Sequence, residues 1–365
     1  MKKIGILGCT GEIGSKLLET LKDKFALKAA FHKKSPSIKW INVEYSQFDV
    51  YDKNKLIIFI QECYIIVNCA GSSFINGTYI AQCCSHYGVI YIDPFGANFL
   101  ENEIARLNLK GTFVLSSGCF PGLCGIAMRH MCESYEKVNS ISGICIDKQI
   151  PGLNGVVDFI ISGLKEFGEA SYYYDGTKRY DNEKEIFRDF DGNGVEVQKY
   201  YTTEIADIVK RYSIQKAIWY TPVLSKEITE VMQKAIIEYI QTKRYDSLYR
   251  YAKKVQDMIT DNSYQAMKSD CEINIYATGI VSGEYNKRNI VLKSMCGSLS
   301  TAAVLNTVLF KLMKEMFEPG VYYATDIVSL SDILANNDST ILQIYSNDDS
   351  VNVNGRGIVY EEGCL

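Results

Sequence analysis

The sequence has few of the residues and spacings that bind zinc in small modules. Its 365 residues include only three histidines, and none of its 12 cysteines forms a Cys-x-x-Cys pair. Cys119, Cys124, His130 and Cys132 lie close together in the sequence, but their spacing matches no common zinc site. We therefore expect no metal, and we expect these residues to pack on or around one helix.

No apolar run is long enough to cross a bilayer. The segment KLIIFIQECYIIVNCAG is interrupted by Gln61, Glu62 and Asn68. The first residues, MKK and a short apolar run broken by glycines, do not form a signal peptide. We therefore expect a cytoplasmic protein with reduced thiols and no membrane partner.

An excess of basic residues is also missing. The chain has 39 Lys and Arg against 43 Asp and Glu, a formal net charge of -4, which excludes a broad nucleic-acid surface. Hydrophobic residues make up 47% of the chain, enough for a sizeable core, and the length predicts two or three domains. A small molecule is the expected partner.

Over the first 120 residues, short apolar runs alternate with longer amphipathic ones. The expected strands are KIGILG, ALKAAF, INVEYSQFDV, CYIIVNCAG, VIYIDP and TFVLSS, and the expected helices cover 15–24, 52–62, 78–87 and 100–108. This alternation predicts an α/β fold, a Rossmann doubly wound parallel sheet with helices on both faces.

The pattern changes after SSGCFPG. Helices are expected over LCGIAMRHMCESYEKV, 226–242 and 246–258, and antiparallel strands over CEINIYATGIVSGE and KRNIVLKSM. These segments predict a second, α+β domain. SLSTAAVLNTVLFKLMKEM then has apolar residues at helical spacing, and we expect this helix to pack back on the first domain.

Three glycines follow the first expected strand. A dinucleotide's diphosphate needs backbone N–H groups and a helix N-terminus, with no side chain in the way. Gly8 suits the bend, Gly11 the close approach of the diphosphate, and Gly14 the packing of the helix on the strand. The expected cofactor-binding residues here are Gly8, Thr10, Gly11, Glu12, Ile13 and Gly14.

No acidic residue follows the second expected strand, where an NAD site carries one for the ribose hydroxyl. The sequence there is FHKKS, and His32, Lys33 and Lys34 can neutralise an extra phosphate. We therefore expect NADP(H) to be preferred over NAD(H); the alternative is a solvated surface loop.

Other strand ends meet at the same edge of such a sheet, where ligands bind. Residues expected there beside the cofactor are Asp49, Val50, Ala70, Gly71 and Ser72. Asp93 and Cys119 follow the fifth and sixth expected strands.

Several segments, in their order and spacing, together resemble the saccharopine dehydrogenase-like oxidoreductases. They are GILGCTGEIGSKL, QFDVYD, VNCAG, YIDPFG, SSGCFPGL and GSLSTAAVLNTVLFKLM with PGVYYATDIV. The resemblance implies a dinucleotide-binding domain of residues 1–123 and 296–335. It also implies an inserted α+β substrate and dimerisation domain of residues 124–295, which leaves a polar arm over 336–365.

The resemblance further implies hydride transfer between NAD(P) and a C–N bond of an amino-acid-derived substrate, in a homodimer. Two departures stand against a saccharopine-type diacid. Phe120 occupies the position where saccharopine reductases carry an acidic residue before Pro-Gly, and PFGAN lacks a glutamate found in many relatives.

Hydride transfer to an imine also requires a proton for the nitrogen. The expected catalytic residues are Asp93, Cys119 and Tyr91, and Asp147 and Lys148 are further candidates. Arg129 and Arg179 are the expected contacts of a substrate carboxylate, with Arg188 as another arginine in the same tyrosine-rich region.

Two other functions remain open. A short-chain carbonyl reductase would need Tyr-x-x-x-Lys on a helix, whereas Tyr174 and Lys178 are separated by DGT, a turn sequence. A non-catalytic NADP-binding regulator would keep the glycine loop and lose polar groups around it.

Overall fold

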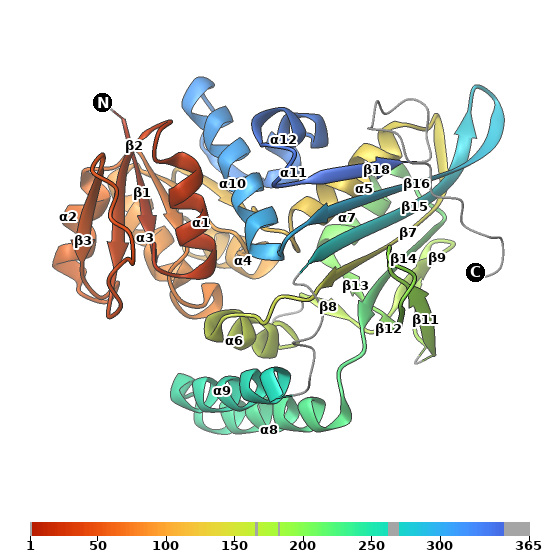
Figure 1. Ribbon diagram of the computed structural model, residues 1–365, viewed down its shortest axis with the longest axis horizontal. Coiled ribbons are helices and arrows are strands. Elements are labelled where there is room, and N and C mark those ends of the chain that lie inside the picture. The colour runs from red at the N-terminus through yellow and green to blue at the C-terminus, as the bar shows by residue number, and fades with distance from the viewer. Residues whose placement is uncertain (1, 165–166, 182, 262–269, 347–365) are drawn as a thin grey trace.

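The computed structural model describes residues 2–164, 167–181, 183–261 and 270–346 of the chain. Two sheets lie side by side, each with its own helices, as Figure 1 shows. Within the described residues, no helix combines the length and hydropathy required to span a membrane.

The first sheet is parallel and has the strand order β17-β6-β5-β4-β1-β2-β3. Its strands are β1 (Lys3–Leu7), β2 (Ala26–Phe31), β3 (Val43–Gln47), β4 (Ile65–Asn68), β5 (Ile90–Ile92), β6 (Thr112–Leu115) and β17 (Gly320–Tyr323). The predicted doubly wound Rossmann sheet is therefore confirmed, and β17 extends it beyond the six strands expected from the first 120 residues.

Helices cover both faces of this sheet. They are α1 (Glu12–Leu21), α2 (Lys53–Gln61), the π-helix η1 (Ser73–Gly77), α3 (Thr78–Tyr87), α4 (Ala97–Arg106) and α10 (Gly297–Lys314). Alternate residues of β1 point to opposite faces: Ile4 and Ile6 pack in the core with α1 and α10, and Leu7 packs with α2 and α3. The packing of α10 on α1 confirms the prediction that this late helix returns to the first sheet.

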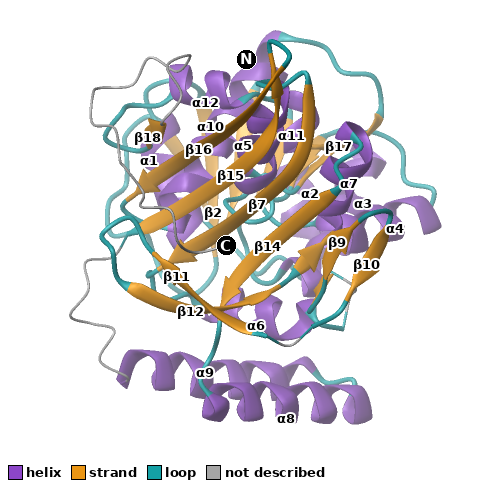
Figure 2. Cartoon of the chain, turned by 90° about the vertical axis from the view of Figure 1, so that its right-hand side faces the viewer, coloured by secondary structure: helices purple, strands orange, loops and turns teal. Residues whose placement is uncertain are grey.

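The second sheet is mixed, with the path β10-β9-β14-β7-β15-β16-β18 (Figure 2). Its main strands are β7 (Lys137–Asp147), β14 (Lys216–Pro222), β15 (Cys271–Val281) and β16 (Glu284–Ser294). Its shorter strands are β9 (Tyr172–Tyr174), β10 (Thr177–Arg179), β11 (Lys184–Arg188), β12 (Gly194–Lys199) and β18 (Gln343–Ser346). Strands β8 (Gly168–Glu169) and β13 (Tyr201–Thr202) pair with each other as a separate two-stranded sheet. The described part of the expected C-terminal arm thus contributes β18, which pairs with β16; residues 347–365 lie outside the described residues.

The remaining helices are α5 (Leu123–Glu133), which packs on β7 and β15 of the second sheet, α6 (Leu153–Ser162), α7 (Thr203–Tyr212), α8 (Lys226–Thr242), α9 (Tyr245–Asp261), α11 (Ala324–Ile327) and α12 (Leu330–Asn336). The predicted range 226–242 is correct at both ends. Ser225 caps the start of α8 by accepting from the Ile228 amide, and Lys243 ends it with a left-handed φ of 55°. Helices α6, α8 and α9 share one apolar cluster, and α6 packs against η1 of the first sheet.

An aromatic contact joins the two sheets. The ring of Phe120, in the loop after β6, stacks on Trp219 of β14 at 5.3 Å and 14°, and meets Phe167 edge-on at 5.8 Å. Phe167 in turn lies 4.9 Å from Phe95, in the loop after β5. The position where the resemblance implies an acidic residue therefore serves apolar packing in this chain.

Removing the Trp219 ring tests this joint. Trp219 is 1% exposed and contacts the backbone of Gly143 as well as Phe120. We expect Trp219→Ala to lower the free energy of unfolding by about 3–5 kcal/mol, measured by urea denaturation. The matched control is Trp40→Ala, since Trp40 is only half-buried under the Lys22 ammonium group. Equal losses in both variants would contradict a special role for the Trp219 contact.

Candidate cofactor and active site

The turn between β1 and α1 packs main chain against main chain. Gly8 has a left-handed φ of 76°, and a Cβ on it would lie 2.3 Å from the carbonyl oxygen of Cys69 in the loop after β4. A Cβ on Gly14 would lie 2.3 Å from the Gly8 carbonyl oxygen. Both glycines are required by these contacts, as the predicted bend and helix packing demand.

Gly11 differs from its two neighbours. A Cβ there would meet nothing closer than the Gly8 carbonyl oxygen at 3.4 Å, so the fold itself does not require glycine at this position. Gly11 is also the N-cap residue of α1, which has no side-chain cap. No side chain therefore caps the first backbone amides of α1, and Gly11 beside them is exposed and has no side chain. An anion can approach these amides closely. The predicted residues Thr10, Glu12 and Ile13 flank this position.

His32, Lys33 and Lys34 follow β2 and are exposed. The imidazole Nε2 of His32 lies 3.5 Å from the Asp49 carboxylate after β3, so two of the predicted cofactor-binding residues contact each other. Within the described ranges, Lys33 and Lys34 form no ion pair. They therefore provide the unpaired positive charge at this corner, while the Asp49 carboxylate has the His32 imidazole as its neighbour. Val50 follows Asp49 and packs in the adjacent core.

The loop after β4 brings Ala70, Gly71 and Ser72 beside the glycine turn. Gly71 has a φ of 69°, and a Cβ on it would lie 2.7 Å from the Asn76 amide nitrogen. The Asn76 side chain donates to the Ala70 carbonyl, and the Asn68 side chain accepts from the Ala70 amide at 3.3 Å. Two asparagines thus fix the shape of this loop.

Asp93 lies at the centre of a buried network after β5. One of its oxygens accepts from the Tyr91 hydroxyl at 2.6 Å and from Asn68 at 3.3 Å. The other accepts from the Ser73 hydroxyl at 2.6 Å and the Phe95 amide at 2.9 Å. Asp93 and Tyr91 are both 0% exposed, and burial raises the pKa of each. The structure brings these two predicted catalytic residues together. Their hydrogen bonds stabilise the loops after β4 and β5.

A second carboxylate, which the sequence analysis missed, lies next to this network. Asp158 on α6 accepts from the Ser72 hydroxyl and from the amides of Ser73 and Phe74, at the start of η1. Burial raises its pKa to about 7, and the nearby Asp93 carboxylate adds to the shift. At neutral pH this group can both hold and release a proton. Its sequence signal is a single acidic residue within the apolar helical run GLNGVVDFIISG.

A third carboxylate lies close to Phe120. Glu204, in the first turn of α7, accepts from the Gly122 amide at 2.7 Å, and a Cβ on Gly125 would lie 2.6 Å from it. Burial raises its pKa to about 8. Its second oxygen is buried and has no hydrogen-bond partner within the described part of the chain. An acidic group therefore contacts the Pro-Gly turn from α7, although position 120 itself is aromatic.

The third predicted catalytic residue, Cys119, has different neighbours. Its amide donates to the Thr301 hydroxyl of α10 at 3.0 Å, and its Sγ lies 3.7 Å from the Sγ of Cys271 at the start of β15. The expected packing of Cys124 and Cys132 on one helix is observed, since both are buried on α5. Their predicted companion Cys119 instead belongs to a group of thiols from both sheets.

The two predicted substrate arginines do not join the carboxylates. The Arg129 guanidinium donates to the backbone carbonyls of Thr325 and Val328, at either end of α11. The Arg179 guanidinium lies on β10, exposed, 4.5 Å from the centre of the Tyr174 ring. The Asp175–Gly176 turn between β9 and β10 has left-handed φ angles of 49° and 85°, so Tyr174 and Lys178 flank a hairpin turn and not a helix.

The segment after β7 of the second sheet reaches the glycine turn. The Gln149 amide group, after β7, donates to the Glu12 carboxylate at 2.7 Å and accepts from the Ser298 amide at 3.3 Å. Gln149 therefore bridges the N-termini of α1 and α10. Lys148, another candidate from the sequence, is instead paired with Asp189 at 3.1 Å and Asp270 at 3.2 Å.

The raised pKa of Asp158 predicts a pH dependence of stability. Its pKa is about 7 in the folded chain and about 3.9 in an unfolded one. The contribution of this carboxyl to stability is therefore fully present below pH ~4 and is lost as the pH rises through 7. We expect Asp158→Asn to reduce the fall in the free energy of unfolding between pH 5 and pH 8, measured by urea denaturation.

The matched control for this pH experiment is Asp257→Asn, which removes an exposed carboxylate from α9. It should follow the wild-type curve. Parallel curves for wild type and Asp158→Asn would show that Asp158 does not titrate in this range.

Comparisons with known proteins agree with this architecture. No protein-family model matches the sequence, and no curated protein sequence matches it. Among solved structures, apo saccharopine dehydrogenase (L-Glu forming) from Saccharomyces cerevisiae is similar over 95% of this chain and 100% of its own, with a TM-score of 0.61 and 10% sequence identity.

Two further structures are less similar. DAP dehydrogenase of C. glutamicum has 11% identity, a TM-score of 0.45 and coverage of 92% of this chain and 99% of its own. Uronate dehydrogenase from Agrobacterium tumefaciens has 22% identity and a TM-score of 0.23, over 26% of this chain and 40% of its own. The yeast structure shows that the chain has the fold of saccharopine dehydrogenase along nearly its whole length, which confirms the predicted resemblance at the level of the fold.

Proposed function

We propose that the chain is an NADP(H)-dependent oxidoreductase that transfers hydride to or from a C–N bond of a small amino-acid-derived substrate. The observation that carries this proposal is the open position at Gly11, beside the uncapped N-terminus of α1, in a chain with the full-length fold of saccharopine dehydrogenase. The resemblance also implies a homodimer formed through the second domain, which the mass in solution tests.

The residues present fit a dinucleotide. Gly8 and Gly14 shape the turn, and the α1 amides with Gly11 would hold the diphosphate. The loop of Ala70, Gly71 and Ser72 would lie beside it, because β4 adjoins β1 in the sheet. When bound, the nicotinamide supplies or accepts the hydride, and the protein orients the two partners and handles the proton.

Asp158 is the best-placed group for that proton. Its pKa of about 7 lets it exchange a proton near neutral pH, and its Ser72 hydrogen bond places it at the loop expected to border the cofactor. Asp93 and Tyr91 help to hold this arrangement in place. Ser73 donates its amide to Asp158 and its hydroxyl to Asp93, so it connects the two carboxylates. We therefore assign Asp93 and Tyr91 to positioning and Asp158 to proton transfer.

The preference for the phosphorylated cofactor is supported by charge. Lys33 and Lys34 are exposed, and the only nearby predicted acidic residue, Asp49, is paired with His32. A 2′-phosphate at the end of β2 would meet two lysines free of ion pairs among the described residues.

The proposal is tested by NADPH oxidation with pairs of 2-oxo acids and amino acids. We expect turnover that requires both partners, because the imine forms from them. Asp158→Asn should lower kcat at least about tenfold and remove the ionisation near pH 7 from the pH profile, with cofactor affinity unchanged. Asp257→Asn is the control. NADPH binding without turnover on any imine or carbonyl would instead favour a non-catalytic NADP-binding protein.

The phosphate contact is tested separately. We expect the double variant Lys33→Ala with Lys34→Ala to weaken NADPH binding at least about tenfold and NADH binding little, measured by cofactor fluorescence. Lys226→Ala with Lys234→Ala, two exposed lysines of α8, is the charge-matched control. An equal loss for both cofactors would contradict the assignment of the phosphate to this corner.

The diphosphate contact has its own variant. Gly11→Leu should leave the thermal unfolding midpoint close to that of wild type, because a Cβ meets no close atom, and should abolish binding of both cofactors. Gly163→Leu is the control, since Gly163 has no atom near its Cβ position and lies at the end of α6. Unchanged NADPH affinity in Gly11→Leu would contradict the loop assignment.

A further inference from the structure

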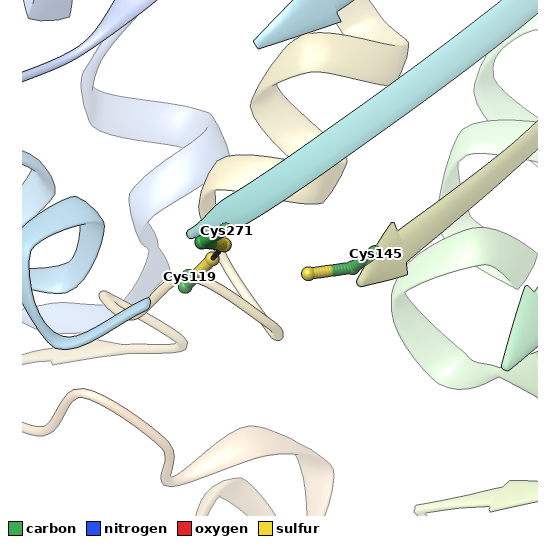
Figure 3. A group of neighbouring side chains, drawn as sticks. All are labelled: Cys119, Cys145 and Cys271. Carbon is green, nitrogen blue, oxygen red and sulfur yellow. Dashed lines mark hydrogen bonds between the residues drawn. The ribbon is translucent and has the colours of Figure 1, made fainter. Parts of the chain in front are cut away.

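Four cysteines from distant parts of the sequence meet where the two sheets join. Cys119 lies in the loop after β6, Cys124 in the first turn of α5, Cys145 near the end of β7 and Cys271 at the start of β15. Figure 3 shows three of them, with the Cys145 sulfur pointing toward the neighbouring sulfurs of Cys119 and Cys271. All four are free thiols.

The sulfur atoms converge on one point. Those of Cys119, Cys145 and Cys271 all lie within 4.8 Å of one another, and the Cys119–Cys271 pair is 3.7 Å apart. The Cys124 thiol lies near this group, because Cys119 and Cys145 both affect its pKa, but it lies outside the set of sulfurs that share this spacing. Three sulfurs therefore form the cluster, and Cys124 is their neighbour.

We propose that Cys119, Cys145 and Cys271 form a metal site for a thiophilic ion, with Zn²⁺ as the expected occupant, and that the neighbouring Cys124 moves in as the fourth ligand when the ion binds. Tetrahedral zinc with Zn–S bonds of about 2.3 Å requires sulfur atoms about 3.8 Å apart, and the observed Cys119–Cys271 separation of 3.7 Å matches that edge. Four protein thiolates close the coordination shell, so the site is structural.

The strand register explains how two of the ligands come together. Cys145 pairs with Ile273 and Cys271 pairs with Asp147 in the antiparallel β7–β15 ladder. Cys145 and Cys271 therefore project from the same face of neighbouring strands, two positions apart. Cys119 comes from the loop after β6 of the first sheet and Cys124 from the start of α5, so a bound ion would fasten the loop after β6 to β7 and β15 of the second sheet.

The surroundings suit a soft metal ion. Cys119, Cys124 and Cys271 are buried, whereas Cys145 is partly buried. Burial raises the pKa of Cys124, and the contact with Cys119 together with burial raises the pKa of Cys271. Metal binding by thiols releases their protons to solvent, so the affinity for the ion falls as the pH falls.

This site differs from the group that lies together in the sequence. The spacing of Cys119, Cys124, His130 and Cys132 in the sequence matches no common zinc site. In the structure, the neighbours of Cys119 are Cys145 and Cys271, which the pairing of β7 with β15 brings together, and not His130 or Cys132. The site is independent of the proposed reaction, because neither Asp158 nor the glycine turn belongs to it.

The test is the metal content of the full chain purified with reductant and Zn²⁺, measured by inductively coupled plasma mass spectrometry. We expect about one zinc ion per chain in the wild type, and a loss of at least about fivefold in Cys145→Ser and in Cys271→Ser. The matched control is Cys132→Ser, a buried cysteine on the same helix as Cys124, which should keep the wild-type content.

A second measurement avoids dependence on variants that fold poorly. Co²⁺ bound to the wild-type chain should give sulfur-to-cobalt charge-transfer bands and the intense visible bands of tetrahedral cobalt, and Zn²⁺ should abolish them. Metal content near zero with no cobalt spectrum would overturn the proposal. Zinc retained in both Cys145→Ser and Cys271→Ser, or a Cys119–Cys271 disulfide in the purified protein, would do the same.

Discussion

The rest of the structure depends on the turn between β1 and α1, where backbone packs directly against backbone because glycines carry no side chains. Gly8 lies against the Cys69 carbonyl, and Gly14 lies against Gly8, so neither position accepts a side chain. This packing brings the N-terminus of α1 to the edge of the sheet without a capping side chain. The fold therefore presents free amides beside the loop after β4, where a dinucleotide of the proposed kind would bind.

The second domain completes this edge in three ways. Asp158 from α6 binds Ser72, Gln149 joins the starts of α1 and α10, and the stack of Phe120 on Trp219 holds the loop after β6. Each contact joins residues more than seventy positions apart in the sequence. The proposed proton-transfer group therefore depends on the orientation of the two domains as much as on the Rossmann sheet. The thiol cluster lies at the same place, since Cys119 follows β6 of the first sheet while Cys145 and Cys271 lie on β7 and β15 of the second sheet.

The sequence predicted most of the fold, because apolar periodicity and glycine position are local signals. Six of the seven strands of the first sheet, the helix over 226–242 and the return of α10 were all predictable. Asp158, Glu204 and the meeting of Cys119 with Cys271 were not, because tertiary contacts bring them together. The hydrogen-bond partners of Arg129 were not predictable either. Its distance from the Pro-Gly turn in the sequence does not show that it binds two backbone carbonyls of the α11 region. The pairing of His32 with Asp49 likewise depends on the alignment of β2 with β3.

Amide hydrogen exchange with and without NADPH tests the central claim most directly, because it locates the contact on the main chain of the unmodified protein. The account predicts that NADPH slows exchange in peptides covering residues 8–14, with a smaller effect over residues 69–72 and no change in α8. Binding of NADPH that protects other segments and leaves residues 8–14 unchanged would contradict it.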